Sequence, residues 1–254
     1  ILVRADGLDL LFDCGHNCKR ICEALAKVGT DPNSINAVFL THSHSDHIQG
    51  VDVFMRKFNI PVFGTYKTLC AFKRTCRKEH SPELDRVLES SEIVFDGNEG
   101  KVVVKWCQTP HDAEGSVCYK VVVGDKSCMI MTDLGYVTND ISEMAMGVDG
   151  ILIEANYDNE MLIYGPYDYM LKKRVGGPYG HLSNDDCGKM MVELIKSGTR
   201  KFILGHLSEN NNVPELALGT VVSILMQNGY NLGVDYEVKV ANRYEPTESL
   251  VIAP

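Results

Sequence analysis

The 254-residue sequence lacks any long hydrophobic run. No apolar stretch approaches the roughly 20 residues that a membrane-spanning helix needs. The chain also opens at Ile1 without the basic segment and small-residue cleavage site of a secretory signal. We therefore expect neither insertion into a membrane nor export.

Basic residues are in short supply relative to acidic ones. The chain has 25 Lys and Arg against 34 Asp and Glu, a formal net charge of −9 at pH 7. Such a balance argues against a globally basic surface that wraps nucleic acid, although local basic patches can still bind phosphates.

The sequence also lacks a disulfide pattern. Its nine cysteines are odd in number and scattered through apolar segments, which favours reduced thiols and a cytoplasmic location. Three of them, Cys14, Cys18 and Cys22, recur at i, i+4 and i+8 and share one helix face. Buried small residues explain that spacing better than a metal or iron–sulfur site.

No linker, repeat or low-complexity segment interrupts the chain, so residues 1–254 are predicted to form one domain. The helix beginning after Ser183 and ending before Gly198 has apolar residues at helical spacing. Other helices are predicted at 18–28, 46–57, 66–78, 138–146 and 214–228. Strands rich in branched and aromatic residues are predicted at 1–4, 8–15, 35–42, 60–65, 101–109, 116–124, 127–135, 150–156, 201–206, 236–241 and 248–254. This order predicts an α/β fold, an αβ/βα sandwich with two mixed sheets inside and helices outside.

The segment "LTHSHSDHIQG", residues 40–50, contains three of the eight histidines of the chain and an aspartate directly after an apolar strand. Its four candidate ligands are His42, His44, Asp46 and His47. Neutral imidazole and carboxylate suit Zn²⁺, Mn²⁺ or Fe²⁺, so the turn is predicted to supply half of a two-metal site.

Three further strands end in a polar residue of the same kind. They are "CQTPHDAEG" with His111, "MIMTDLG" with Asp133 and "FILGHLSE" with His206. Each would be an ordinary surface residue if it stood alone. Together with the histidine-rich turn they are predicted to complete the metal site.

This set of residues resembles the metallo-β-lactamase-fold hydrolases, whose signature is a His-x-His-x-Asp-His turn followed by His, Asp and His at later strand ends. The resemblance implies a four-layer sandwich and two divalent ions, Zn or Mn with Fe as a further option. It assigns His42, His44 and His111 to the first ion, Asp46, His47 and His206 to the second, Asp133 as a bridge and Asp13 as the residue that braces the turn.

Other motifs indicate a branch of the family. "LIEAN", "GHLSN" and "LGHLSENN" resemble motifs of tRNase Z-type phosphodiesterases, and the whole chain is most similar to the YycJ (WalJ) group of exonuclease-like hydrolases. That group implies 5′-to-3′ exonuclease activity on DNA. The family normally begins with a strand and a Gly/Ser-rich turn, and the first N-terminal strand is expected to be missing from this sequence. Tyr157 stands where the family leads us to expect His.

Two basic segments could contact substrate. The segment "FKRTCRKEH" is predicted to be helical, with Lys73, Arg74, Arg77 and Lys78 on one side. We favour a solvated helix face over a phosphate contact for these four residues. His80 in the same segment is predicted at the surface. The segment "LKKR" lies shortly before "GHLSN" and contains Lys172, Lys173 and Arg174. We give equal weight to a substrate contact by these residues and to a solvated helix face.

The sequence therefore predicts a metal-dependent phosphodiesterase with a nucleic-acid substrate, DNA being favoured. Asp46 would orient or deprotonate the attacking water, His181 would protonate the leaving group, and Glu154 would hold the other nitrogen of His181. Ser183 begins a helix whose N-terminus could draw a phosphate close. Three alternatives stay open, namely hydrolysis of a thioester, lactone or β-lactam, processing of RNA, and a regulatory module without activity. The sequence indicates no oligomeric state.

Overall fold

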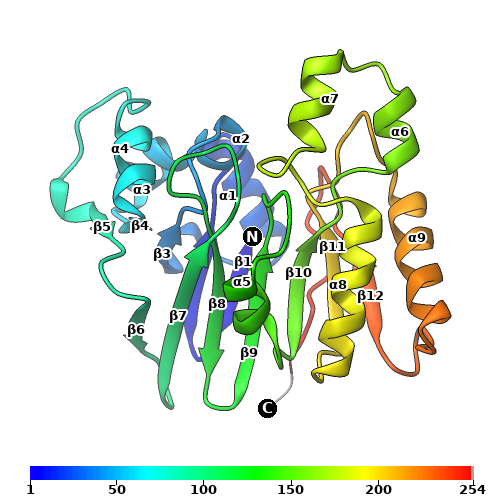
Figure 1. Ribbon diagram of the computed structural model, residues 1–254. Helices are drawn as coiled ribbons and strands as arrows, with labels where there is room; N and C mark the ends of the chain where they lie inside the picture. The colour runs from blue at the N-terminus through cyan, green and yellow to red at the C-terminus, as the bar shows by residue number, and fades with distance from the viewer. Residues whose placement is uncertain (253–254) are drawn as a thin grey trace. The chain divides into compact units, whose positions relative to one another are not determined.

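The computed structural model describes residues 1–252, which divide into two compact units (Figure 1). Unit 1 comprises Ile1–Trp106 and Ala113–Val117. Unit 2 comprises Cys107–Asp112 and the chain from Cys118 onward. No helix in the described residues is long and apolar enough to cross a membrane.

Unit 1 contains a mixed sheet with the strand order β1-β2-β3-β4-β5. β1 pairs antiparallel with β2, and the remaining neighbours are parallel. The strands are β1 (Leu2–Ala5), β2 (Leu8–Phe12), β3 (Ile35–Phe39), β4 (Val62–Gly64) and β5 (Asp85–Val87). An antiparallel hairpin follows, formed by β6 (Glu92–Asp96) and β7 (Lys101–Gln108).

The helices of unit 1 bury one apolar face each. In α1 (Cys18–Lys27) that face carries Cys18, Ile21 and Leu25, and the Asn17 side chain caps the first turn. The other helices are α2 (Ser45–Ile48), α3 (Val51–Phe58) and α4 (Tyr66–Lys73), with short 3₁₀ turns η1 (Pro32–Ser34) and η2 (Pro82–Leu84). Their apolar side chains pack with those of β2 to β4 in one core.

Unit 2 repeats this arrangement of strands. Its sheet has the order β12-β11-β10-β9-β8, where β8 pairs antiparallel with β9 and the other neighbours are parallel. The strands are β8 (Val117–Val123), β9 (Lys126–Met131), β10 (Gly150–Glu154), β11 (Lys201–Gly205) and β12 (Glu237–Val240). The helices are α5 (Asn139–Ala145), α6 (Asn159–Tyr164), α7 (Tyr169–Val175), α8 (Asn184–Lys196) and α9 (Pro214–Gln227).

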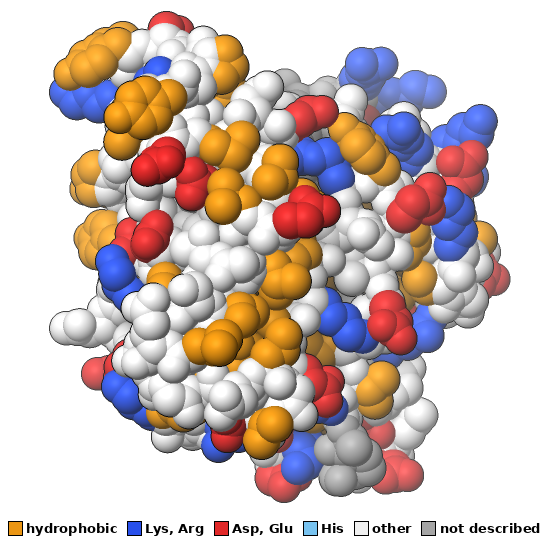
Figure 2. All heavy atoms as spheres, turned by 90° about the vertical axis from the view of Figure 1, so that its right-hand side faces the viewer, with side chains coloured by type: hydrophobic (Ala, Val, Ile, Leu, Met, Phe, Trp, Pro, Cys, Tyr) orange, Lys and Arg blue, Asp and Glu red, His pale blue; other side chains and the backbone are white. Residues whose placement is uncertain are grey.

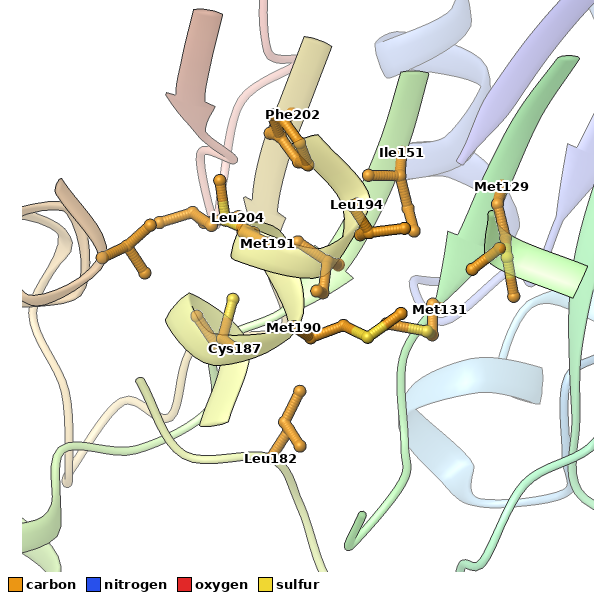
Figure 3. Close-up of a cluster of buried hydrophobic side chains, with 14 of the residues drawn as sticks. Met129, Met131, Ile151, Leu182, Cys187, Met190, Met191, Leu194, Phe202 and Leu204 are labelled. Carbon is orange, nitrogen blue, oxygen red and sulfur yellow. The ribbon is translucent and has the colours of Figure 1, made fainter. Parts of the chain in front are cut away.

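The core of unit 2 lies between the parallel strands and α8 (Figure 3). Met131 of β9, Ile151 of β10 and Phe202 of β11 face Met191 and Leu194 of α8, and all five side chains are at most 2 % exposed. Parallel strands are covered on both faces, which explains their nearly continuous apolar sequences. This packing fixes the ends of β9, β10 and β11, where the polar residues follow.

The α/β class and the two mixed sheets with helices are confirmed, and most predicted elements are present. Several details of the prediction are wrong. The predicted helix at 46–57 is two helices, which meet around Gly50. The predicted helix at 66–78 ends at Lys73, so the four basic residues of "FKRTCRKEH" do not share a helix face. Residues 248–252 form no strand, while 253 and 254 lie outside the described residues. The sequence prediction omitted β5, β6, α6 and α7. Cys14 lies before α1, so it does not share a helix face with Cys18 and Cys22. That residues 1–254 are one domain stays a prediction.

Candidate metal centre

The histidine-rich turn lies between β3 and α2 in unit 1. His42 is fully buried and His47 is nearly so. The His42 ring lies 4.6 Å from the His44 ring and 4.1 Å from the His47 ring, measured between centroids. The turn thus brings three imidazoles together, while the Asp46 side chain at the start of α2 is 67 % exposed.

Asp13, which directly follows β2, holds this turn in place. One carboxylate oxygen accepts the Thr41 backbone N–H at 2.8 Å, and the other accepts the Thr41 hydroxyl at 2.7 Å and His47 Nδ1 at 2.8 Å. Since the Thr41 hydroxyl donates to Asp13, it accepts from His42 Nδ1 at 3.0 Å. Both imidazoles are therefore in the tautomer that has its lone pair on Nε2, as metal-binding histidines are.

The backbone after Asp13 approaches the turn closely. Cys14 donates its N–H to the His47 carbonyl at 2.8 Å and accepts the Gly50 N–H at 2.9 Å. A Cβ on Gly15 would lie 1.7 Å from the Asp46 carbonyl oxygen, so glycine is required at this position.

Asp13→Ala is expected to weaken divalent-metal affinity by about 10- to 100-fold, the usual effect of removing a group that orients a metal-binding histidine. Competition with a chromophoric chelator measures it. Asp31→Ala is the matched control, because the Asp31 carboxylate caps η1 by accepting the Asn33 N–H. Unchanged affinity in folded Asp13→Ala would contradict the role of Asp13.

In unit 2, polar residues stand at the ends of three neighbouring strands. Asp133 follows β9, Glu154 is the last residue of β10 and His206 follows β11. These strands are parallel neighbours, so their carboxyl ends meet at one edge of the sheet. Asp133 and His206 have φ values of 62° and 56°. Non-glycine residues seldom adopt this conformation, and such residues cluster at functional sites.

Glu154 is the centre of the unit 2 cluster and is fully buried. Its Oε1 accepts His181 Nδ1 at 2.8 Å and His206 Nδ1 at 2.7 Å. Its Oε2 accepts the backbone N–H groups of Leu134 at 3.2 Å and Leu182 at 3.1 Å. Every acceptor site of this carboxylate is thereby used to position other groups.

These contacts shift the pKa values of Glu154 and His181. Burial by itself would raise the pKa of Glu154, but the nearby His181 and His206 outweigh it and hold that pKa well below its usual range. Burial would lower the pKa of His181, and the Glu154 carboxylate outweighs it, so the pKa of His181 lies above its usual value. The pair therefore favours a protonated His181.

His111 completes the cluster within unit 2. Its Nδ1 donates to the Gly180 carbonyl at 3.0 Å, which again places the lone pair on Nε2, and Nε2 lies 3.7 Å from Asp133 Oδ1. The His111 and His181 rings are 5.1 Å apart. The segment from Val175 to Ser183 thus contains both His181 and the Gly180 carbonyl that holds His111.

Ser183 begins α8 as predicted, and its hydroxyl accepts the Asp186 N–H at 3.1 Å. The same hydroxyl donates to the Asp186 carboxylate at 2.9 Å. Asp185 and Asp186 both lie in the first turn of α8. Their negative charge opposes binding of an anion at this helix N-terminus. That Ser183 and this N-terminus contact a phosphate stays a prediction.

Tyr157 has a packing role in unit 2. It is buried against Leu162 and Val175, in a small apolar cluster beneath α6 and α7. Burial raises the pKa of Tyr157 to about 12, which keeps the phenol neutral. We call the two helices it supports, residues 159–175, the α6–α7 lobe.

Lys172, Lys173 and Arg174 are the candidate substrate contacts on this lobe, and two of them have partners in unit 2. Lys172 Nζ donates to the Ile163 carbonyl at 2.7 Å, which joins α7 to α6. Arg174 Nε lies 2.5 Å from an Asp112 carboxylate oxygen. Lys173 lies between them in α7 and is exposed.

Buried asparagines support this end of unit 2, and sequence reasoning missed them. Asn156 donates to the His206 carbonyl at 2.7 Å. Asn212 donates to Asn184 Oδ1 at 2.8 Å and to the Ala155 carbonyl at 2.9 Å. The segments "EAN" and "ENNN" were the available signals, because polar groups that hydrogen-bond around a candidate ligand orient it.

The donor set fits divalent metal ions. His42, His47, His111 and His206 each hold Nδ1 against an oxygen of their own unit, and carboxylates stand beside them. Within unit 2, ligand atoms of Asp133, Glu154, His181 and His206 all lie within 4.8 Å of one another. Imidazole with carboxylate is the ligand chemistry of Zn²⁺, Mn²⁺ and Fe²⁺ in proteins.

The Metallo-beta-lactamase superfamily model matches residues 1–206, which include all seven predicted ligands. The chain belongs to the metallo-beta-lactamase superfamily. Among superfamily members, "Exodeoxyribonuclease WalJ" of Streptococcus pneumoniae serotype 2 (strain D39 / NCTC 7466) is 37% identical over 233 residues, 90% of this chain and 84% of the relative. "Exodeoxyribonuclease YycJ" of Bacillus anthracis is 29% identical over 98% of this chain and 92% of the relative.

Solved metallo-beta-lactamase structures share the fold. YhfI from Bacillus subtilis gives a TM-score of 0.68 at 17% identity and covers 94% of this chain and 87% of that structure. The short form of human tRNase Z gives 0.58 at 20% identity, with 82% and 85% covered. These likenesses support the fold. Within this superfamily the chain is a metal-dependent hydrolase.

Proposed function

We propose that the protein is a two-metal phosphodiesterase that degrades DNA as a 5′-to-3′ exonuclease. The observation that carries the proposal is the 37% identity to an exodeoxyribonuclease over 90% of the chain. The candidate metal ligands that stand at strand ends in both units also support it. In this proposal His42, His44 and His111 would hold the first ion, Asp46, His47 and His206 would hold the second, and Asp133 would be shared by both.

A pair of divalent ions bound by these residues would supply a water of lowered pKa and offset negative charge on the phosphate. The residues of the chain do the rest. His181 would donate a proton from Nε2 to the leaving oxygen, because Glu154 holds its Nδ1 at 2.8 Å and fixes the ring. Asp46, whose carboxylate is exposed, would orient the attacking water.

The experiment that tests this function compares four substrates. The protein loaded with Mn²⁺ or Zn²⁺ is incubated with end-labelled single- and double-stranded DNA and RNA, and the products are separated by length. The proposal expects DNA to be shortened stepwise from its 5′ end. Faster cleavage of RNA would support an RNA-processing nuclease, and hydrolysis confined to thioesters, lactones or β-lactams would refute a phosphodiesterase.

The α6–α7 lobe supports a nucleic-acid substrate. Tyr164, Tyr169 and Met170 on it are 83%, 76% and 71% exposed. Figure 2 shows hydrophobic side chains beside basic ones at the top of the face that carries α6 and α7. Aromatic side chains next to cations suit stacking of unpaired bases along a phosphate backbone.

Lys173→Ala is expected to raise the KM for long single-stranded DNA and to flatten its salt dependence by about 0.7 in the logarithmic slope, the value for one phosphate contact. Lys172 and Arg174 already have partners in unit 2, so Lys173 is the sharper probe. Hydrolysis of a small phosphodiester should stay unchanged. Lys196→Ala, which removes an exposed lysine paired with Glu193, is the control. Equal loss on both substrates would contradict a role in binding nucleic acid.

A further inference from the structure

The side chain of His80 in unit 1 is buried, contrary to the surface position predicted from the sequence. Its side chain is only 7% exposed, although Lys78, Glu79 and Ser81 around it are exposed. His80 Nε2 lies 3.0 Å from one oxygen of Asp85 and 3.1 Å from the other, and the Asp85 side chain is 6% exposed. An imidazole held this firmly within an otherwise exposed segment needs a physical reason.

The second nitrogen of His80 supplies one. His80 Nδ1 is buried and has no hydrogen-bond partner among residues 1–252. Buried nitrogens almost always have a partner, and an exception points to a water or an ion. Because Nε2–H donates to the Asp85 carboxylate, the neutral ring carries its lone pair on Nδ1. A carboxylate behind an imidazole is the arrangement that orients metal-binding histidines.

Two further ligand side chains lie beside His80. Ligand atoms of Asp52, Cys76 and His80 all lie within 4.8 Å of one another. Asp52 belongs to α3 and is buried, and Cys76 lies just after α4. None of the three belongs to the candidate metal centre, and that centre has no cysteine among its predicted ligands.

The present contacts of Asp52 and Cys76 leave room for coordination. Asp52 Oδ1 accepts Arg56 Nε at 2.7 Å, whereas Oδ2 has the longer contacts, 3.1 Å to Arg56 Nη2 and 3.3 Å to the Arg77 N–H. A carboxylate oxygen has two lone pairs, so Oδ1, which accepts one hydrogen bond, has a second lone pair that can bind a metal. Cys76 Sγ makes a weak hydrogen bond of 3.6 Å to the Phe72 carbonyl. Burial raises the pKa of this thiol to about 11, so coordination would release its proton.

The surroundings suit a structural ion. Between α4 and β6, the chain has only η2 and β5, three residues each, as regular structure. An ion bound by Asp52, Cys76 and His80 would tie this segment to α3. A cavity of about 530 Å³ lies beside Cys76 and His80, and its lining also includes the basic residues Lys73, Arg77 and Lys78.

We propose that Asp52, Cys76 and His80 form a zinc site in unit 1 that is separate from the candidate metal centre. Thiolate, imidazole and carboxylate together favour Zn²⁺ over Mg²⁺ or Mn²⁺, and a water completes four-coordination. The ion would stabilise the segment that follows α4. This proposal does not depend on the proposed nuclease function.

Cobalt titration of the full chain tests the site, because a thiolate bound to Co²⁺ gives a near-ultraviolet charge-transfer absorption that imidazole and carboxylate ligands do not give. Wild-type protein is expected to show this band, and Cys76→Ser and His80→Asn are expected to lose it. Cys70→Ser, which removes another half-buried thiol of the same region, should keep it. Circular dichroism verifies that each variant is folded.

Zinc content supplies a second measurement that does not rely on a cysteine. Elemental analysis should find one zinc ion per chain fewer in His80→Asn than in wild type, with nuclease activity unchanged. Zinc should also raise the Tm of wild type more than that of His80→Asn. A missing cobalt band in wild type, a band that persists in folded Cys76→Ser, or equal zinc content in wild type and His80→Asn would overturn the proposal.

Discussion

His181→Ala is expected to lower the turnover of a substrate with an alkoxide leaving group by about 10² to 10⁴, the usual effect of removing a general acid. Hydrolysis of an activated phenolate ester should fall much less, because that leaving group needs no proton. In the proposed mechanism Glu154, which holds His181 Nδ1 at 2.8 Å, leaves Nε2–H to donate to the substrate. Turnover of bis(p-nitrophenyl) phosphate and of a DNA oligonucleotide measures the contrast.

The same variant separates a proton donor from a metal ligand. His181 lies with Asp133, Glu154 and His206 in a group that could itself bind a metal. If His181 is a proton donor, the His181→Ala variant should retain both ions of the candidate centre. Loss of an ion, or an equal slowing of both substrates, would make His181 a ligand or a positioning residue.

Glu154→Gln cannot serve as a milder version of that test. Glu154 Oε1 accepts His206 Nδ1 at 2.7 Å as well as His181 Nδ1, so the substitution disturbs a predicted metal ligand too. We expect it to lower metal affinity in addition to turnover. The sequence suggested only the contact with His181.

The double variant His42→Ala/His44→Ala is expected to have the largest effect on activity. It removes two of the three predicted ligands of the first ion. Without that ion the pKa of the attacking water rises toward that of bulk water, so turnover should fall to the level of the buffer blank. Elemental analysis should show the loss of one ion per chain from the candidate centre.

His16→Ala is the matched control for this double variant, because His16 is an exposed histidine close in sequence to the Asp13 loop and outside the predicted ligand set. The comparison is best made in the Cys76→Ser background, where the proposed zinc site of unit 1 does not contribute. A double variant that keeps its full metal content and turnover would refute the assignment of the first ion.

The candidate ligands could be predicted because their positions follow from local sequence. A His-x-His-x-Asp-His turn directly after an apolar strand keeps three imidazoles close in sequence, and the structure shows the His42 ring 4.6 Å from the His44 ring and 4.1 Å from the His47 ring. The positions of Asp133 and His206 could be predicted equally well, because the carboxyl ends of parallel strands meet at one edge of a sheet. That the donor sets of the two units share one pair of ions stays a prediction.

Residues whose environment depends on distant segments could not be predicted. His80 is buried because Asp85 and the residues of α3 surround it, and its neighbours in sequence are exposed. The apolar segment 248–252 has the composition of a strand but forms none. The short helices α6 and α7 have no long periodic pattern. They depend on aspartate caps, Asp158 and Asp168, and on a small cluster around Tyr157.

The measurement that tests the proposed exonuclease activity most directly is metal-dependent digestion of 5′-end-labelled single-stranded DNA. Protein stripped with EDTA should be inactive. Readdition of Mn²⁺ should restore release of label in the smallest products at the earliest times, and His42→Ala/His44→Ala should not respond. Undiminished digestion by the stripped protein, or no digestion by the metal-loaded wild type, would contradict a metal-dependent exonuclease.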